Sequence, residues 1–217
     1  MQARFRLRTG PENQMRVRPT IIVLAAGAGS RYRGDRHKLE ESLGTFTVLG
    51  TTLRNASQTQ LPLLVVTTAA RAALVGKQVA TRDILVVSDA DAARGMGDSI
   101  AAGVAERSGA SGWLVLPGDM PLVTPASMLA VATALEQYPV AFAQHRGRRG
   151  HPVGFSAELY SELVRLSGDD GARRVMARYP AHGVELDDAG VLLDVDTVAD
   201  LDVLRTRLLQ PKVQAVD

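Results

Sequence analysis

Short, continuous runs of apolar residues recur along the chain, and each run is bounded by polar residues, glycine or proline. Runs rich in valine, isoleucine and leucine are typical of strands that are buried on both faces of a parallel sheet. We therefore predict strands at 21–24, 61–67, 83–87, 112–116, 139–144 and 152–155, and shorter ones at 184–186 and 191–193.

Between these runs, apolar side chains return every three or four positions, which is the spacing of one face of a helix. We predict helices at 47–60, 69–79 and 156–166, and further helices that start near Asp98 or Ser99, after Thr124, near 172 and after Thr197. Strands that alternate with helices indicate a three-layer α/β/α domain of Rossmann-like type with a mostly parallel sheet.

The first predicted strand leads into a turn of small residues that ends in an arginine, at 25–31. Gly27 and Gly29 lack a Cβ, so the backbone there can bend sharply and expose N–H groups, and such groups bind phosphate oxygens. The planar guanidinium of Arg31 matches phosphate geometry. The pattern predicts a phosphate-binding loop, and a tight strand-to-helix turn without a ligand is the alternative.

Two common phosphate-binding motifs do not fit this turn. The dinucleotide motif G-x-G-x-x-G needs a third glycine where Tyr32 stands, which disfavours a nicotinamide oxidoreductase. The P-loop needs a lysine after Gly34, and Asp35 is there instead.

Asp119 follows another predicted strand, in the sequence Pro117-Gly118-Asp119-Met120-Pro121. Ligands of open α/β sheets bind at the carboxyl ends of the strands, so Asp119 is expected in the same layer as the glycine-rich turn. A carboxylate opposite a phosphate loop suits Mg²⁺, which takes one or two carboxylates together with phosphate oxygens. An aspartate that only shapes a turn is the alternative.

A second acidic stretch lies near the end of the chain. Asp194 and Asp196 alternate along an extended segment, so their side chains should point the same way. Thr197 and Asp200 have the spacing of a capping box, which gives Asp200 a structural role.

Composition limits the class of protein. There is no cysteine, so disulfides, thiolate metal sites and cysteine nucleophiles are excluded. Five of the 25 basic residues and one of the 23 acidic residues fall in 1–18, so the remainder has 20 basic against 22 acidic side chains and is not a basic nucleic-acid binder. We expect a disordered basic tail at 1–18, with Met15 as an alternative start, and one domain at 19–217. No apolar run is long enough to span a membrane, and we expect a cytoplasmic protein.

The order of these motifs resembles that of molybdenum cofactor cytidylyltransferases, which are nucleotidyltransferases of the nucleotide-diphospho-sugar transferase fold. The resemblance covers nearly all of residues 20–209. It rests on Leu24-Ala25-Ala26-Gly27-x-x-x-Arg31, Gly95-Met96-x-x-Ser99, Gly118-Asp119-x-Pro121, Gly150-His151-Pro152 and the segment 168–173.

The chain departs from the family pattern after Arg31. Gly34 lies one place late and Lys38 two places late, and Arg36 occupies the position where the strict spacing puts the lysine. Leu39 follows Lys38, as in the family, so we prefer Lys38 to Arg36 as the cation that meets the phosphates.

The resemblance also implies roles for individual residues. Arg31, Lys38 and Asp119 would be catalytic, and Asp119 and Asp196 would hold Mg²⁺, with Mn²⁺ as a possible substitute. A basic loop at 145–152 would present Arg148, Arg149 and His151 to the acceptor. The nucleotide would contact Leu24, Ala25, Ala26, Gly27, Gly29, Ser30, Arg31, Lys38, Thr67, Gly95, Met96 and Ser99.

The implied reaction is transfer of a nucleoside monophosphate from a triphosphate, CTP by the resemblance, to a molybdopterin-type cofactor with release of pyrophosphate. A molybdoenzyme or its chaperone is the implied protein partner, with no nucleic acid and no membrane. One alternative is a guanylyl- or other nucleotidyltransferase that acts on a different phosphate acceptor. Another is a catalytically silent nucleotide-binding subunit that delivers cofactor.

Overall fold

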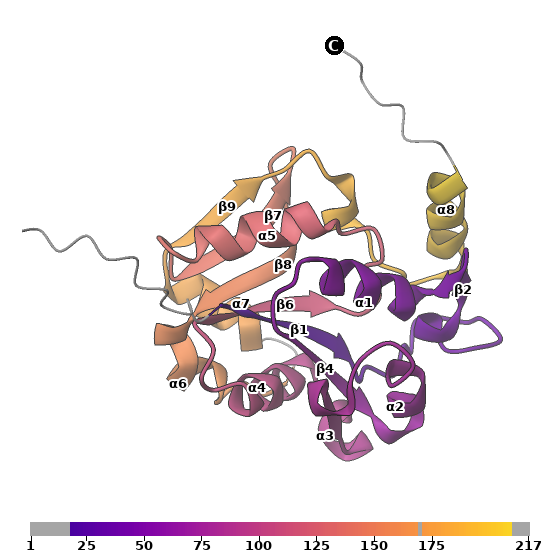
Figure 1. The fold of residues 1–217 in the computed structure, drawn as a ribbon, viewed down its shortest axis with the longest axis horizontal. Helices are drawn as coiled ribbons and strands as arrows, with labels where there is room; N and C mark the ends of the chain where they lie inside the picture. The colour runs from indigo at the N-terminus through magenta and orange to yellow at the C-terminus, as the bar shows by residue number, and fades with distance from the viewer. Residues whose placement is uncertain (1–17, 169–170, 210–217) are drawn as a thin grey trace, which may run out of the picture.

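A computed structural model describes residues 18–168 and 171–209, so all of the tail predicted at 1–18 except Arg18 lies outside this part of the chain. The described residues form a central seven-stranded sheet in the order β5-β4-β1-β6-β8-β7-β9 (Figure 1). The strands are β1 (Thr20–Ala25), β4 (Leu63–Thr68), β5 (Ile84–Val87), β6 (Gly112–Pro117), β7 (Val140–His145), β8 (Arg148–Ser156) and β9 (Ala181–Glu185).

Most neighbouring strands are parallel. β1 pairs in parallel with β4 and β6, β4 with β5, and β7 with β9. β8 is antiparallel to both β6 and β7. The expected mostly parallel sheet is confirmed, and the carboxyl ends of β1, β4, β5 and β6 therefore meet at one edge.

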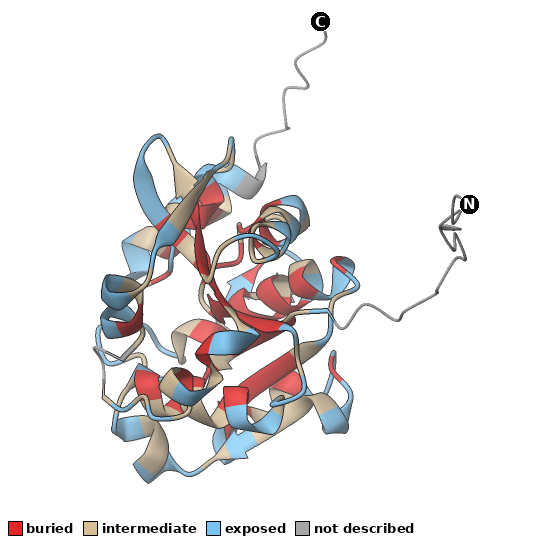
Figure 2. Ribbon diagram, turned by 90° about the vertical axis from the view of Figure 1, so that its left-hand side faces the viewer, coloured by how far each residue is buried: buried red, intermediate tan, exposed pale blue. Residues whose placement is uncertain are grey.

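Alternate residues of each strand face opposite sides of the sheet, so the sheet has a core on each face. Ile21 and Val23 pack with Leu49 and Leu53 of α1 (Val48–Gln58) in one core, to which α5 (Pro125–Ala134) also contributes. Ile22 packs in the other core with side chains of α4 (Met96–Glu106) and α7 (Gly171–Arg178). Figure 2 shows the buried residues concentrated in the strands and on the helix faces toward them. The continuous apolar runs arise because both faces are covered.

The remaining elements are short, apart from the last helix. They are α2 (Ala69–Val75), α3 (Asp89–Ala93), α6 (Tyr160–Leu163), α8 (Val198–Leu209), the hairpin β2 (Ser42–Leu43) and β3 (Phe46–Thr47), and the 3₁₀ turns η1 (Lys38–Glu40), η2 (Thr81–Asp83), η3 (Ala157–Leu159) and η4 (Ala189–Leu192). α8 packs on the small hairpin through Leu201 and Leu204, which contact Leu43. None of the described helices is long and apolar enough to cross a membrane.

Several sequence predictions of local structure are wrong. The strand predicted at 191–193 lies largely in η4, and the helix predicted at 156–166 is only η3 followed by α6. The predicted loop at 145–152 is a hairpin whose turn is Arg146-Gly147, both with positive φ, and β8 already begins at Arg148.

α4 begins earlier than predicted, at Met96, with Gly95 as its N-cap. The backbone of Gly95 has φ 129, which favours glycine. Asp98 is not the cap, because its carboxylate accepts hydrogen bonds from Arg94 and from the backbone N–H of Gly168. The predicted capping box is confirmed: Asp200 accepts from the N–H of Thr197, whose hydroxyl accepts from the N–H of Asp200.

Candidate functional site

A cavity of about 620 Å³ lies at the carboxyl ends of β1 and β6. One wall is the glycine-rich turn after β1, and another is the start of α4. Twelve of the predicted site residues line it: Leu24, Ala26, Gly27, Gly29, Ser30, Arg31, Lys38, Gly95, Met96, Ser99, Asp119 and Asp196. The predicted nucleotide site and metal site are therefore parts of one cavity.

Asp119, Asp194 and Asp196 bring their carboxylates together, each with an oxygen within 4.8 Å of the others, and Asp119 and Asp196 line this cavity. Asp119 follows β6, and the other two come from the segment that leads into α8. The backbone N–H of Val195 donates to the carbonyl of Asp119 at 3.0 Å, while the Val195 side chain is fully buried. Because neighbouring side chains of an extended segment point to opposite sides, Asp194 and Asp196 point away from the core that buries Val195 and toward Asp119.

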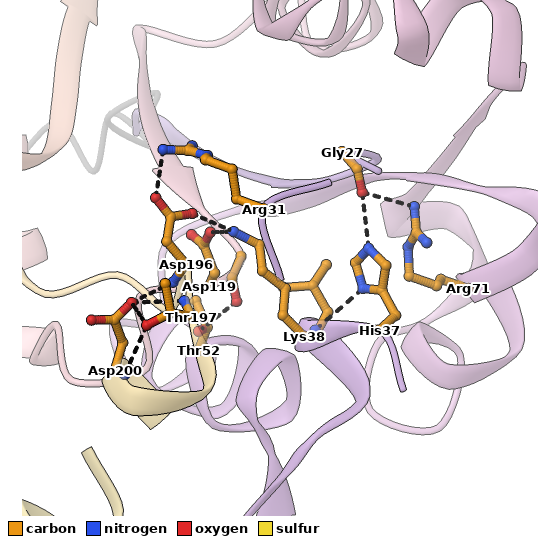
Figure 3. Close-up of polar contacts among 12 residues, drawn as sticks. Gly27, Arg31, His37, Lys38, Thr52, Arg71, Asp119, Asp196, Thr197 and Asp200 are labelled. Carbon is orange, nitrogen blue, oxygen red and sulfur yellow. Dashed lines mark hydrogen bonds and ion pairs between the residues drawn. The ribbon is translucent and has the colours of Figure 1, made fainter. Parts of the chain in front are cut away.

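Lys38 and Arg31 supply positive charge to these carboxylates (Figure 3). The Nζ of Lys38 lies 2.6 Å from Asp119 Oδ2 and 3.0 Å from Asp196 Oδ1, and Arg31 Nη1 lies 2.7 Å from Asp196 Oδ2. Burial disfavours the charged form of Lys38, but the carboxylates of Asp119 and Asp196 outweigh it and raise the pKa of Lys38 above its ordinary value. Of the two candidate cations, Lys38 thus lies in the cavity, whereas Arg36 does not line it and is exposed.

The acidic cluster has the properties of a divalent metal site. Burial, and then the charges of Asp119 and Asp196, raise the pKa of Asp194, as expected when like charges share a site. In the part of the chain that the structure describes, the buried Oδ1 of Asp119 has no hydrogen-bond partner. An oxygen-rich cluster with an unsatisfied buried carboxylate oxygen suits Mg²⁺ or Mn²⁺.

The turn that carries Asp119 is anchored to β1 and α1. Gly118 donates its N–H to the carbonyl of Leu24 at 2.9 Å, and its carbonyl accepts from the buried Thr52 hydroxyl at 2.9 Å. A Cβ at Gly118 would stand 2.9 Å from the Leu24 carbonyl oxygen. Because glycine allows this close approach of the two backbones, Asp119 is held beside the glycine-rich loop.

The other predicted site residues do not line the cavity. Ala25 is a fully buried core residue. Thr67 is fully buried, and its hydroxyl lies 3.5 Å from the carbonyl of Ala25. Arg148 is exposed beside the hairpin turn, and the guanidinium of Arg149 stacks 4.4 Å above the ring of Phe142. Contacts of these residues with substrate stay predictions.

His151, the third predicted acceptor residue, is affected electrostatically by the acidic cluster. Burial lowers its pKa, and the charge of Asp119 acts in the opposite direction. It belongs to β8 rather than to the exposed hairpin turn.

Three residues in or next to the site were not assigned a role from the sequence. Asp194 was recognised only as a neighbour of Asp196, although its alternation with Asp196 was a usable signal. Arg173, in the segment 168–173, lines the cavity opposite the loop. Arg71 lies behind the loop, and its side chain donates to three loop carbonyls. No motif or periodicity marks it.

Comparisons with known proteins show which family the chain resembles. Purine catabolism protein PucB of Bacillus subtilis (strain 168) is 36% identical over 121 residues, which are 53% of this chain and 58% of that protein. Molybdenum cofactor cytidylyltransferase of Escherichia coli K12 is 25% identical over 186 residues, 86% of this chain and 95% of that protein. The match to PucB thus spans less than two thirds of its length.

The fold is also found in solved structures. That of Rv0371c from Mycobacterium tuberculosis H37Rv has a TM-score of 0.75 at 29% identity, covering 87% of this chain and 98% of that chain. A structure of the same protein in complex with manganese has a TM-score of 0.72. The family model described as the MobA-like NTP transferase domain matches residues 21–184. With that match over most of its length, the chain belongs to the MobA-like NTP transferase domain family and is a nucleotidyltransferase.

Proposed function

We propose that this nucleotidyltransferase moves CMP from CTP to the phosphate of a molybdopterin-type cofactor and releases pyrophosphate. The observation that carries the proposal is the meeting of the glycine-rich loop, Lys38, Asp119 and Asp196 at one cavity, with the carboxylate of Asp194 beside those of Asp119 and Asp196. The choice of substrates is supported by the similarity to the cytidylyltransferase of Escherichia coli, which extends over most of both chains.

In this reaction an oxygen of the acceptor phosphate forms a bond to the α-phosphorus of CTP. The bond from that phosphorus to the oxygen bridging to the β-phosphorus breaks, and pyrophosphate leaves with the electron pair. The acceptor phosphate is already ionised, so no general base is needed. Catalysis of this kind depends on positioning and charge neutralisation, which agrees with a site built from a loop, cations and carboxylates.

The residues divide this work by their place in the cavity. The backbone of 26–30 and the side chain of Arg31 bind the triphosphate, and Lys38 neutralises charge between the phosphates and the aspartates. Asp119, Asp194 and Asp196 would hold Mg²⁺ or Mn²⁺, which neutralises phosphate charge when bound. The start of α4, with Gly95, Met96 and Ser99, forms the wall that meets the base. His151, with Arg148 and Arg149, is assigned to the acceptor side.

Pyrophosphate release tests the proposal directly. The protein is mixed with Mg²⁺, molybdopterin and, separately, CTP, GTP, UTP or ATP. Release with CTP and molybdopterin is expected. Release only with GTP would make the chain a guanylyltransferase, and release with none of the four would indicate the nucleotide-binding delivery subunit instead.

Asp119→Asn is the matched variant for this assay. It keeps the size of the side chain and removes the charge, so we expect kcat to fall by roughly a hundredfold or more. The melting temperature should stay close to that of the wild type, measured by differential scanning fluorimetry. Activity near the wild-type value would remove Asp119 from the reaction.

A further inference from the structure

One buried arginine contacts three successive carbonyl groups of the glycine-rich loop, on the side of the loop that faces away from the cavity. Arg71 lies in α2 and is 8% exposed. Its Nε donates to the carbonyl of Ala25 at 3.0 Å, and its Nη2 donates to those of Ala26 and Gly27 at 3.1 and 3.2 Å. A single planar guanidinium thus fixes three peptide units.

His37 contacts the same loop at the carbonyl of Gly27, which Arg71 also contacts (Figure 3). Its Nδ1 accepts from the N–H of Leu39 at 3.2 Å, so that nitrogen carries no proton, and its Nε2 donates to the carbonyl of Gly27 at 3.1 Å. A Cβ at Gly29 would stand 2.9 Å from His37 Nε2, and Gly29 has φ +62. His37 is also the N-cap of η1, whose first residue is Lys38.

The direction of the carbonyls determines the direction of the amides. In a trans peptide, the C=O and N–H bonds of one unit point in opposite directions. Because the carbonyls of residues 25–27 point to Arg71, the N–H groups of Ala26, Gly27 and Ala28 point away from it. These three residues line the cavity, so the loop presents amide donors where a polyphosphate would lie.

The charge of Arg71 is not neutralised by an ion pair. Among residues 18–168 and 171–209, no carboxylate lies within 4.0 Å of its guanidinium. Burial lowers the pKa of Arg71, and the more distant charges of Glu40 and Asp89 act in the opposite direction. A buried cation that no carboxylate contacts raises the electrostatic potential of its surroundings. An anion bound on the far side of the loop would partly compensate this charge.

We propose that Arg71 and His37 are positioning residues for polyphosphate binding: they turn the amides of 26–28 toward the anion, and Arg71 adds positive potential behind them. The proposal rests on the proposed function only in that the anion is the triphosphate of the nucleotide. Neither residue touches the reacting atoms.

Binding of inorganic tripolyphosphate in the presence of Mg²⁺, measured by calorimetry, tests this role without nucleotide or acceptor. We expect Arg71→Met to weaken binding roughly tenfold or more. Arg71→Lys keeps the charge but cannot bridge three carbonyls, so an intermediate loss is expected. Arg82→Met is the matched control, because it removes an 87% exposed arginine side chain in η2, just before β5, and its binding should equal that of the wild type.

Chemical rescue distinguishes a positioning role of the Arg71 guanidinium from a general structural role of the side chain. Guanidinium ion added to Arg71→Ala at millimolar concentration should restore tripolyphosphate binding, and it should not change binding by Arg82→Met. If the Arg71 variants fail to fold, His37→Leu decides: it should weaken tripolyphosphate binding, whereas His37→Gln, which keeps a donor, should retain most of it.

Wild-type tripolyphosphate binding by folded Arg71→Met, or by His37→Leu where the Arg71 variants do not fold, would overturn the proposal. So would a wild-type protein that does not bind tripolyphosphate. Loss of binding in the variants, together with no transfer from any nucleotide, would support the loop assignment and reject the proposed function.

Discussion

At the scale of single residues, Lys38 is the counter-charge of the acidic cluster. Its Nζ contacts Asp119 and Asp196, and its side chain is 13% exposed. Lys38→Met would leave three clustered carboxylates with less positive charge nearby, so their affinity for a divalent cation should rise. We expect tighter Mn²⁺ binding without nucleotide, measured by electron paramagnetic resonance, together with a fall in kcat of roughly a hundredfold.

Arg36→Met is the control for this prediction. Arg36 has the position where the strict motif spacing puts the cation, but it is exposed. Both Mn²⁺ binding and kcat should remain close to the wild-type values. A larger loss of activity in Arg36→Met than in Lys38→Met would reverse the assignment of the phosphate-binding cation.

Which site residues the sequence reveals depends on how each one reaches the cavity. Asp119 and the loop at 25–31 follow strands, and the carboxyl ends of parallel strands meet at one edge, so their meeting was predictable. Arg71 acts through backbone carbonyls, and an arginine that binds peptide groups leaves no motif in the sequence. Thr67 was assigned to the nucleotide by resemblance, but its side chain is buried between strands.

At the scale of elements, Asp188 joins η4 to the start of α5. Its Oδ2 accepts from the N–H and hydroxyl of Thr124 and from the hydroxyl of Ser127, and its Oδ1 accepts from the N–H of Gly190. These bonds fasten the segment that continues to Asp194 and Asp196.

Asp188→Ala should therefore lower the free energy of unfolding by about 2 kcal/mol, because several donors lose their acceptor at once. Urea denaturation measures the change. Asp187→Ala is the matched control, since Asp187 is exposed, and its stability should be within about 0.5 kcal/mol of the wild type. Equal stability of the two variants would show that the Asp188 network contributes nothing.

Elements whose local sequence pattern determines their structure were predicted well, whereas elements that depend on tertiary contacts were not. The runs at 21–24 and 112–116 became β1 and β6 because apolar strands covered on both faces have an unmistakable pattern. The run at 191–193 became part of η4, because Asp188 draws the backbone of Gly190 into a tight turn. A short apolar run carries no signal that separates these outcomes.

At the scale of the whole molecule, the cavity-lining residues among those that the structure describes lie between Leu24 and Asp196. Deleting residues 1–14 should therefore leave kcat/KM within roughly twofold of the full-length value, since these cavity residues are all retained. Steady-state kinetics of the two forms provide the measurement. A large loss would show that the basic N-terminal segment takes part in substrate binding.

Two histidines with lowered pKa values contribute to the pH dependence of stability just below neutral pH. Burial, and then the charge of Arg71, lower the pKa of His37 below 6.5, against the opposing effect of its bond to Gly27. Burial likewise lowers the pKa of His151. As the pH falls below 6.5, the unfolded chain binds protons that these folded histidines do not, so the free energy of unfolding should decrease. The stabilisation is fully present above pH 6.5 and is lost toward the folded-state pKa values.

The variant His37→Gln isolates the contribution of His37 to the pH dependence of the free energy of unfolding, because glutamine does not titrate in this range. Urea denaturation at intervals from pH 7.5 to 5.5 should show a wild-type loss of at most about 1.4 kcal/mol per pH unit for each histidine, and a shallower slope for the variant. If the slope were unchanged, the neutral ring of His37 would contribute nothing to the pH dependence. Such a result would contradict the hydrogen-bond assignment, because a protonated Nδ1 can no longer accept from the N–H of Leu39.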